Sequence, residues 1–585
     1  MAGWCDRVAA GADPRPALQA LHAAVLADTG TAVWIHRCEG SAWQAQLELL
    51  SARMAESTDR QALQARYPLL GVPFAVKDNI DIAGAPTTAA CPAHSHVATG
   101  TAGAVQRLLD AGALWLAKTN LDQFATGLVG TRSPYGRPAS VADASRISGG
   151  SSSGSAVAVA RGLAAFALGT DTAGSGRVPA GFNGLVGLKP TPGRVSTAGV
   201  LPACRTLDCV SVFAHGVADA TRVLAVMEGL DPADPYSAFA PGPAALPARL
   251  RLGLPKVPVF HGDAGYEAAW AAATAKAAAA GHTLVEIDFT PLQAVAALLY
   301  EGPWVAERHA VVRRLLEERP EALDPTVRRV IERAKSFSAT DAFAAQYRLK
   351  AAQVALAALW RQVDLLMVPT APGHPTFAEV DADPVGANAR LGAYTNFVNL
   401  LGWCALALPA GTTARGLPFG VTFIAAGGLD AALARFGQQW TGEAQAPTPR
   451  PATEATLPIA VVGAHLSGLP LNGQLTERGA VLLEATTTAP HYRLYALPGT
   501  VPPKPGLVRS AEGGAAIALE VWAMPQRAVG SFLALIPPPL GLGSVQLADG
   551  RHVHGFLCEP HALAGAREVT AFGGWRAYLA SLSTE

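Results

Sequence analysis

Residues 146–194, RISGGSSSGSAVAVARGLAAFALGTDTAGSGRVPAGFNGLVGLKPTPGR, decide the fold and the chemistry of this chain. Glycine and serine dominate the first third, and an apolar run of Ala, Val, Leu and Phe follows, which a flexible linker would lack. Downstream, Ser175 stands between glycines in the sequence TAGSG. Flanking glycines let the backbone approach a ligand and turn its N–H groups toward it. The stretch therefore predicts a serine nucleophile with an oxyanion hole.

A serine hydroxyl needs a base that removes its proton, and this stretch contains no histidine. The candidate base is Lys77, which ends the apolar run GVPFAVK of a predicted buried strand. Burial lowers the pKa of a lysine and allows it to act as a neutral base. Ser151, in the first glycine–serine loop, can relay the proton between Lys77 and Ser175. These residues predict a Ser-Ser-Lys triad in which Ser175 is the nucleophile, Ser151 the bridge and Lys77 the base.

This arrangement resembles the amidase signature family. The family pattern has a glycine–serine loop, a second serine loop 24 residues later (here 175 − 151 = 24), a GLKPT segment at 187–191 and a strand lysine before Asp-Asn. The resemblance implies an α/β fold in which helices flank a mixed sheet. It also implies a cis peptide bond at Ser151. The implied oxyanion donors are the backbone N–H groups of Thr172, Ala173, Gly174 and Ser175.

The glycine-punctuated segment of residues 119–136 resembles the part of the family that lines the acyl pocket. Thr126 and Gly127 are therefore candidates for substrate binding, although a loop that only covers the core fits the residues equally well. Within the nucleophile loop, Asp171 and Arg177 are expected to brace the backbone rather than to transfer protons.

Composition narrows the class of protein. Half of the 585 residues are hydrophobic, and 45 basic side chains balance 45 acidic ones. This balance is typical of a globular enzyme, and it favours neither nucleic acid nor a membrane surface as a partner. The seven cysteines form no C-x-x-C pair, and no secretory signal or membrane-spanning run is visible. We expect reduced thiols, a cytoplasmic location, and neither a metal nor a cofactor.

The length allows two or three hydrophobic cores. From residue 69 a strand–helix–strand rhythm predicts an α/β sheet with helices on both faces. We predict an amidase domain over residues 1–442, beginning with a helical segment over 1–65. A proline-rich linker over 443–457 follows. Residues 458–585, with short β-rich segments between Gly and Pro, predict a small α+β domain.

A basic segment, YEGPWVAERHAVVRR at residues 300–314, indicates the charge of the substrate. Tyr300 and Arg308 are eight positions apart, so on one continuous helix they would lie about 80° apart and could face one cleft. An arginine fork binds a carboxylate bidentately, and a tyrosine hydroxyl adds a further hydrogen bond. The pattern therefore suggests a small acidic substrate, and a solvated basic helix face is the alternative.

The motif YEGPWVAER, the DTAGSGRVPA form of the nucleophile loop and the appended C-terminal domain together resemble the allophanate hydrolase family. By this resemblance, Tyr300 and Arg308 hold the carboxylate of allophanate. Ser175 attacks the terminal amide, ammonia leaves, and N-carboxycarbamate remains to be decarboxylated. The resemblance assigns that second step to the C-terminal domain, with a γ-glutamylcyclotransferase type of fold. His465, beside a glycine turn, is its candidate catalytic residue; Tyr492, Arg509 and Glu520 are weaker candidates.

Two alternatives stay open. The chain could be another signature amidase that acts on a different small amide, and the C-terminal domain could be only a binding or oligomerisation module. We expect a homodimer. No biotin-attachment motif or ATP-binding loop is present, so we expect that another protein supplies allophanate. A separate urea carboxylase and a triazine breakdown route are both open as that source.

Overall fold

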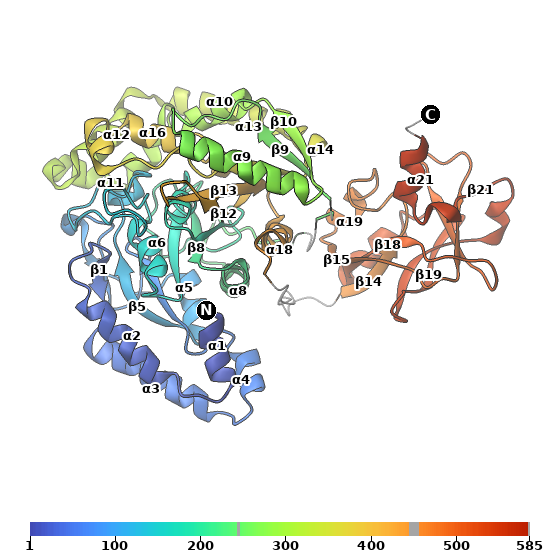
Figure 1. Cartoon of the computed structure of the whole chain (residues 1–585), viewed down its shortest axis with the longest axis horizontal. Coiled ribbons are helices and arrows are strands. Elements are labelled where there is room, and N and C mark those ends of the chain that lie inside the picture. The colour runs from blue at the N-terminus through green and yellow to red at the C-terminus, as the bar shows by residue number, and fades with distance from the viewer. Residues whose placement is uncertain (241, 243–245, 248, 444–455, 583–585) are drawn as a thin grey trace. The chain divides into compact units, whose positions relative to one another are not determined.

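The apolar run that ends at Lys77 forms an inner strand of an eleven-stranded sheet in the computed structural model (Figure 1). The structure describes residues 1–240, 242, 246–247, 249–443 and 456–582. The described residues form two compact units. The larger draws on Met1–Phe239 and Arg249–Thr448, and the smaller on Ala240–Ala248 and Pro449–Glu585. The predicted fold class is confirmed, because helices flank a mixed sheet in the larger unit and the smaller unit is rich in strands.

The large sheet combines two parallel groups with an antiparallel centre. Strand β2 runs parallel to β5 and β6, and β9 runs parallel to β10 and β11. The neighbours between these groups pair antiparallel. In spatial order the strands are β1 (Trp34–Arg37), β5 (Leu114–Thr119), β2 (Pro73–Lys77), β6 (Phe166–Asp171), β8 (Cys209–Ala214), β7 (Val186–Lys189), β12 (Cys404–Thr412), β13 (Pro418–Ala425), β11 (Leu365–Pro369), β9 (Arg251–Pro255) and β10 (Thr283–Ile287).

The strands that carry the site are buried on both faces. Every residue of β2, β5, β6 and β8 is buried, which explains why they read as continuous apolar runs instead of alternating patterns. Helices α6 (Ser153–Ala160) and α8 (Val217–Met227) both pack on β8, and Figure 1 shows them on either side of it. The polar ends of β2 and β6, Lys77 and Asp171, are therefore held inside the protein.

Helices make up most of the rest of the larger unit. None of the described helices is long and apolar enough to cross a membrane. Besides α6 and α8, they are α1 (Ala2–Ala9), α2 (Arg15–Ala27), α3 (Gly40–Ala55), α4 (Arg60–Arg66), α5 (Gly103–Asp110), α7 (Val178–Phe182), α9 (Ala264–Ala279), α10 (Thr290–Tyr300), α11 (Val305–Glu318), α12 (Pro325–Glu332), α13 (Ala339–Leu356), α14 (Leu359–Gln362), α15 (Phe377–Ala382), α16 (Gly386–Leu391), α17 (Asn396–Leu400) and α18 (Asp430–Thr441).

The smaller unit has its own hydrophobic core, which includes the buried indoles of Trp522 and Trp575. A five-stranded sheet has the order β15-β18-β14-β20-β19, and a three-stranded sheet has the order β17-β16-β21. Its elements are β14 (Thr456–Val461), α19 (Gly473–Thr476), β15 (Val481–Thr487), β16 (Tyr492–Ala496), β17 (Pro505–Arg509), β18 (Ala518–Pro525), α20 (Gln526–Leu533), β19 (Leu540–Gln546), β20 (His552–Cys558), β21 (Arg567–Glu568) and α21 (Trp575–Leu582).

Most of the predicted linker, residues 443–457, lies outside the described residues, which resume at Thr456 with the start of β14. The boundaries at 442 and 458 stay predictions. The likeness of the smaller unit to the γ-glutamylcyclotransferase fold also stays a prediction.

Candidate active site

The end of β2 brings Lys77 into contact with the first serine loop. The Nζ atom of Lys77 donates to Oγ of Ser151 at 2.8 Å and to Oγ1 of Thr170 at 2.7 Å. All three side chains are buried, and the peptide bond between Gly150 and Ser151 is cis. Two of the three predicted triad members therefore touch, and Thr170, at the end of β6, completes the lysine's hydrogen bonds.

Burial determines the charge state of Lys77. It lowers the pKa of this lysine from 10.5 to about 7, against the pull of the carboxylates of Asp122, Asp208 and Asp171. Among the described residues, none of these carboxylates forms an ion pair with Lys77, whose hydrogen-bond partners are hydroxyls. A substantial share of the lysine is therefore neutral near pH 7, as a general base requires.

The nucleophile loop is held by a buried ion pair. Arg177 donates to both carboxylate oxygens of Asp171 at 2.9 Å, and neither side chain is exposed. The same carboxylate accepts the backbone N–H groups of Gly174 at 2.9 Å and Gly176 at 3.0 Å. Burial alone would raise the pKa of Asp171, but Arg177 holds it below its ordinary value. These contacts are those of a brace that shapes the loop around Ser175.

Three of the four predicted oxyanion donors have free N–H groups. Gly174 is engaged, since its N–H donates to Asp171. Within the described part of the chain, the N–H groups of Thr172, Ala173 and Ser175 have no intramolecular acceptor. The positive φ of Gly174 (+135°) and the closeness of the Thr395 side chain exclude a Cβ at this position.

Ser175 itself is turned away from the relay. Its Oγ donates to the carbonyl oxygen of Gly127 at 3.4 Å, and no hydrogen bond among the described residues joins it to Ser151. The contact places the nucleophile next to the loop that contains Thr126 and Gly127. Both residues are buried, and Gly127 contacts Ser175 while Oγ1 of Thr126 accepts from Arg308 at 3.1 Å.

A second group of residues surrounds the buried guanidinium of Arg308. Its guanidinium donates to the carbonyl of Ala125 at 3.2 Å, to Oγ1 of Thr126 at 3.1 Å and to the Tyr300 hydroxyl at 3.4 Å. The side chain is only 2% exposed, and its Nε atom has no hydrogen-bond partner. No carboxylate of the described residues forms a salt bridge with Arg308, which leaves a buried positive charge without a counterion.

The expectation that Tyr300 and Arg308 share one helix is wrong. Tyr300 ends α10, and Arg308 lies in α11, which starts at Val305. The intervening Gly302-Pro303 breaks the helix, because proline cannot donate its backbone nitrogen and its ring clashes with the preceding turn. The two side chains still meet, with the Arg308 Cζ atom 5.4 Å from the centre of the Tyr300 ring.

Sequence reasoning missed several residues that complete the site. Asp208 is fully buried, and burial raises its pKa to about 6. It accepts the Thr172 hydroxyl at 2.5 Å and the backbone N–H of Ala203 at 2.8 Å, so it anchors one end of the nucleophile loop. Asn399 in α17 donates to the carbonyl of Asp171 at 2.7 Å. The sequence does carry a signal for Asp208 and Asn399: each is a polar side chain within an otherwise apolar segment, and a buried polar side chain needs a hydrogen-bond partner.

In the smaller unit, His465 follows β14, as expected from the glycine turn. Its Nε2 lies 2.9 Å from Oε1 of Gln474, and its ring stacks on Phe556 at 5.0 Å. Burial lowers the pKa of His465, which favours the neutral imidazole. The side chain borders a small pocket that Lys504 also lines.

The weaker candidates of this unit have structural partners. The carboxylate of Glu520 accepts the backbone N–H of Ser467 at 2.8 Å and pairs with Arg576 at 2.9 Å. The buried Tyr492 hydroxyl accepts the N–H of Gln546 at 2.8 Å, and Arg509 reaches the side chain of Gln546 at 3.5 Å. In the described part of the chain no group of three His, Cys, Asp or Glu side chains could hold a metal ion, and all seven cysteines are buried free thiols.

A buried lysine–serine pair beside a glycine-rich nucleophile loop, on a mixed sheet, defines an amidohydrolase of the amidase signature type. A family model described as amidase matches residues 41–433, and a model described as allophanate hydrolase C-terminal domain matches residues 457–580. The solved structure of Kluyveromyces lactis allophanate hydrolase is 40% identical, covers 98% of this chain and 97% of its own, and superposes with a TM-score of 0.77. The chain therefore belongs to the amidase family and, within it, to the allophanate hydrolases.

Two curated yeast proteins are also similar. Urea amidolyase of Lachancea kluyveri is 44% identical over 555 residues, and that of Saccharomyces cerevisiae is 42% identical over 567 residues. These matches cover 90% and 92% of this chain but only 30% of each relative. The chain thus spans about a third of the length of these two proteins.

Proposed function

We propose that this chain hydrolyses allophanate to ammonia and carbon dioxide, with the amide chemistry in the larger unit and decarboxylation in the smaller one. The observation that carries the proposal is Arg308. A buried guanidinium without a counterion is costly, and a ligand carboxylate that completes it recovers that cost. Its position beside Thr126 and Gly127, next to Ser175, suits an amide that carries a carboxylate on its far end.

The substrate carboxylate would accept hydrogen bonds from the Arg308 guanidinium, whose Nε–H has no partner among the described residues, and from the Tyr300 hydroxyl. Burial raises the pKa of Tyr300, so the phenol stays protonated. Because its oxygen already accepts from Arg308, its own proton is available to the substrate. Two donors of different geometry then orient the substrate and direct its terminal carbonyl toward Ser175.

Acylation begins when Ser175 turns from the Gly127 carbonyl toward Ser151. Neutral Lys77 takes the proton of Ser151, which takes that of Ser175, and the Ser175 Oγ attacks the terminal amide carbon. The N–H groups of Thr172, Ala173 and Ser175 would stabilise the resulting oxyanion. As the C–N bond breaks, the proton returns through Ser151 to the nitrogen, and ammonia leaves.

Deacylation uses the same relay in reverse order. Water passes one proton through Ser151 to Lys77 and attacks the acyl carbon; as the ester C–O bond breaks, that proton returns through Ser151 to Oγ of Ser175, and N-carboxycarbamate is released. This dicarboxylate takes up a proton and loses one carbon dioxide to give carbamate, which takes up a second proton and breaks down to the second carbon dioxide and the second ammonia. We assign this step to the smaller unit with His465 as the candidate residue, and a binding or oligomerisation module is the second possibility for that unit.

A urea-carboxylating activity would supply the substrate, and the similarity to two proteins named urea amidolyase supports this coupling. The homodimer expected from the sequence stays a prediction that sedimentation of the full chain measures. The cytoplasmic location also stays a prediction.

The first experiment counts ammonia released per allophanate consumed, with Ser175→Ala as its partner. We expect two ammonia per substrate and no release above background from Ser175→Ala. Turnover of an uncharged amide without turnover of allophanate would overturn the substrate, while leaving the amidase chemistry intact.

A second experiment separates the two steps by following carbon dioxide release in His465→Ala. We expect slower carbon dioxide release with unchanged release of the first ammonia. The exposed His561, which pairs with Glu559, provides the matched control His561→Ala. Equal carbon dioxide release from both variants would favour a smaller unit that only binds or assembles.

A further inference from the structure

A cavity of about 1020 Å³ opens in the larger unit away from the catalytic residues, since none of Lys77, Ser151, Ser175 and Arg308 lines it. It lies among α9, α16, the segment after β11 and the turn between β12 and β13. Its volume is at the upper end of that of pockets for small organic ligands.

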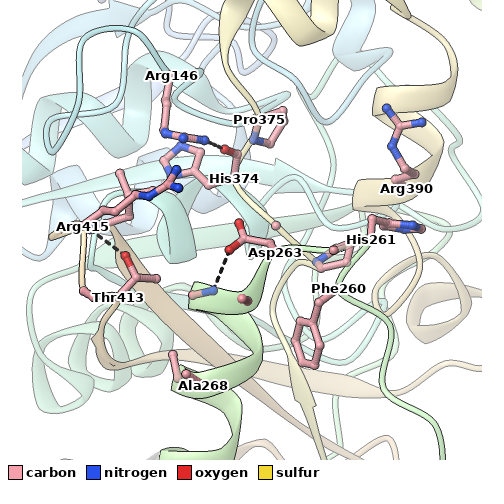
Figure 2. Close-up of a pocket in the computed structure, with 18 of the residues that line it drawn as sticks. Arg146, Phe260, His261, Asp263, Ala268, His374, Pro375, Arg390, Thr413 and Arg415 are labelled. Atoms are coloured by element: carbon pink, nitrogen blue, oxygen red, sulfur yellow. Dashed lines mark hydrogen bonds between the residues drawn. The ribbon is translucent and has the colours of Figure 1, made fainter.

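One wall gathers cationic and imidazole side chains. Figure 2 shows Arg146, His374 and Arg415 together on that side of the cavity, with Asp263 toward its centre. Arg146 pairs with Asp143 at 3.3 Å and donates to the backbone carbonyl of His374. Arg415 is exposed, and no ion pair or hydrogen bond of the described residues engages its side chain. Arg415 is therefore available to an anionic group.

The two acidic groups of the cavity accept hydrogen bonds from backbone N–H groups at helix starts. Asp263 caps α9 and accepts the N–H groups of Gly265 at 3.0 Å and Tyr266 at 3.1 Å. Glu379 belongs to a capping box and accepts the backbone N–H of Thr376 at 2.7 Å. Neither carboxylate forms an ion pair with Arg415 among the described residues, so the Arg415 guanidinium stays available to an anionic group of a ligand.

His374 adds a second, independent signal. The side chain is 2% exposed, stacks on Phe182 at 4.0 Å and places Nε2 at 2.8 Å from the carbonyl oxygen of Ile147. A carbonyl only accepts, so Nε2 carries the proton and Nδ1 presents a lone pair. Burial lowers the pKa of His374 to about 4, which keeps the ring neutral. The buried Nδ1 has no hydrogen-bond partner among the described residues, so it can accept a hydrogen bond from a ligand.

From this juxtaposition we propose that the cavity is a second ligand site for N-acylated organic acids, separate from the catalytic pocket. The carboxylate would pair with Arg415, and the adjacent N–H would donate to Nδ1 of His374. Because the two groups share one wall, the anion and the donor must be close neighbours in the ligand, as they are in an N-acyl amino acid. Ala268 and Ala269 of α9 with Leu417 offer apolar surface to its aliphatic part.

Isothermal titration of the full chain with N-acetylleucine tests the site. The matched probe is the O-acetyl ester of the corresponding hydroxy acid, which replaces the N–H by oxygen and keeps the carboxylate. We expect N-acetylleucine to bind with a dissociation constant below about 1 mM. Arg415→Gln should weaken binding at least about tenfold, Arg415→Lys less, and the ester about fivefold.

A carboxylate could also enter the catalytic pocket, so the titration is repeated in Arg308→Met. We expect that variant to retain the Arg415-dependent binding, and the exposed Arg313→Gln variant to leave it unchanged. Absence of binding in Arg308→Met, or binding there that Arg415→Gln does not weaken, would overturn the second site. Loss of allophanate turnover with retained Arg415-dependent binding would concern the proposed function alone.

Discussion

Two buried arginines of the larger unit are opposites in their surroundings. Arg177 has both oxygens of Asp171 at 2.9 Å, whereas Arg308 has two neutral oxygens of residues 125–126 and a phenol. Two buried lysines repeat the contrast. Lys118 pairs with Asp78 at 3.1 Å, whereas Lys77 donates only to hydroxyls. In each pair, one cation has its counter-charge within the protein and the other does not.

The contrast distinguishes buried cations that stabilise the fold from buried cations that can bind a ligand or transfer a proton. A buried cation with a carboxylate partner is satisfied, and removal of one partner leaves an uncompensated charge. A buried cation without such a partner keeps its reactivity. Lys77 gains and loses its proton near neutral pH, and the Arg308 guanidinium can pair with an anion from a ligand. Lys77 and Arg308, the unpaired members of these two pairs, are the residues that we assign to catalysis and binding.

The largest expected effect comes from Lys77→Met. Without the base, the rate of ammonia release should fall by about 10⁴-fold. The unfolding free energy should nevertheless rise by about 1–3 kcal/mol, because the variant no longer buries an unpaired ammonium. Steady-state assays and urea unfolding of the same preparations measure both changes.

Lys118→Met is the matched test of the paired lysine. It leaves the buried carboxylate of Asp78 uncompensated, so we expect a loss of about 3–5 kcal/mol. If Lys118→Met were as stable as the wild type, or if Lys77→Met were destabilised to the same degree, the distinction between paired and unpaired lysines would be lost.

The two arginines should divide stability and binding in the same way. We expect Arg308→Met to lower kcat/KM for allophanate by about 10²–10³-fold, chiefly through KM, because the substrate carboxylate loses its partner. Its unfolding midpoint should stay close to that of the wild type. Arg177→Met should instead lose about 3–5 kcal/mol of stability, since Asp171 remains buried and charged.

Unfolding curves for both arginine variants, measured beside their kinetics, provide the check. An Arg308→Met variant that unfolds as readily as Arg177→Met would assign Arg308 to the brace and remove the main support for an acidic substrate.

The sequence predicts the parts of the fold and of the site that short local motifs encode. The order of the lysine strand and the two serine loops predicted the sheet and the contact between Lys77 and Ser151, since apolar runs ending in a polar residue place that residue at a strand end. The residue spacing also predicts that Tyr300 and Arg308 meet, but the prediction of a single helix is wrong because Gly302-Pro303 separates α10 from α11.

The rest depended on contacts between distant segments. Thr170, Asp208 and Asn399 acquire their roles only when β6, the segment before β8 and α17 meet around the nucleophile loop. No local spacing indicates such long-range partners. A sequence motif also cannot predict that the Ser175 hydroxyl donates to the Gly127 carbonyl and not to Ser151, because this depends on which acceptor lies nearest in the folded protein.

The pH dependence sharpens the assignment of Lys77. Only the neutral amine acts as a base, so kcat/KM should rise tenfold per pH unit at low pH and level off above an apparent pKa of about 7. The folded protein binds this proton only below about pH 7, whereas the unfolded chain holds it to about pH 10.5. Stability should therefore rise with pH across that interval, and this increment should be absent in Lys77→Met.

The smallest expected effect concerns Thr170, which accepts a hydrogen bond from Lys77 and touches no proposed substrate group. An acceptor stabilises the charged ammonium, so Thr170→Val should lower the pKa of Lys77 further and move the rising limb of the pH profile to lower pH by about one pH unit. The plateau value of kcat should change less than about tenfold, because the neutral amine keeps its contact with Ser151. Thr170→Ser retains the acceptor and should restore the original profile. If Thr170→Val lowered the plateau but left the inflection in place, Thr170 would act on the position of Lys77 rather than on its charge, and the titration would have to be assigned to another buried group such as Asp208.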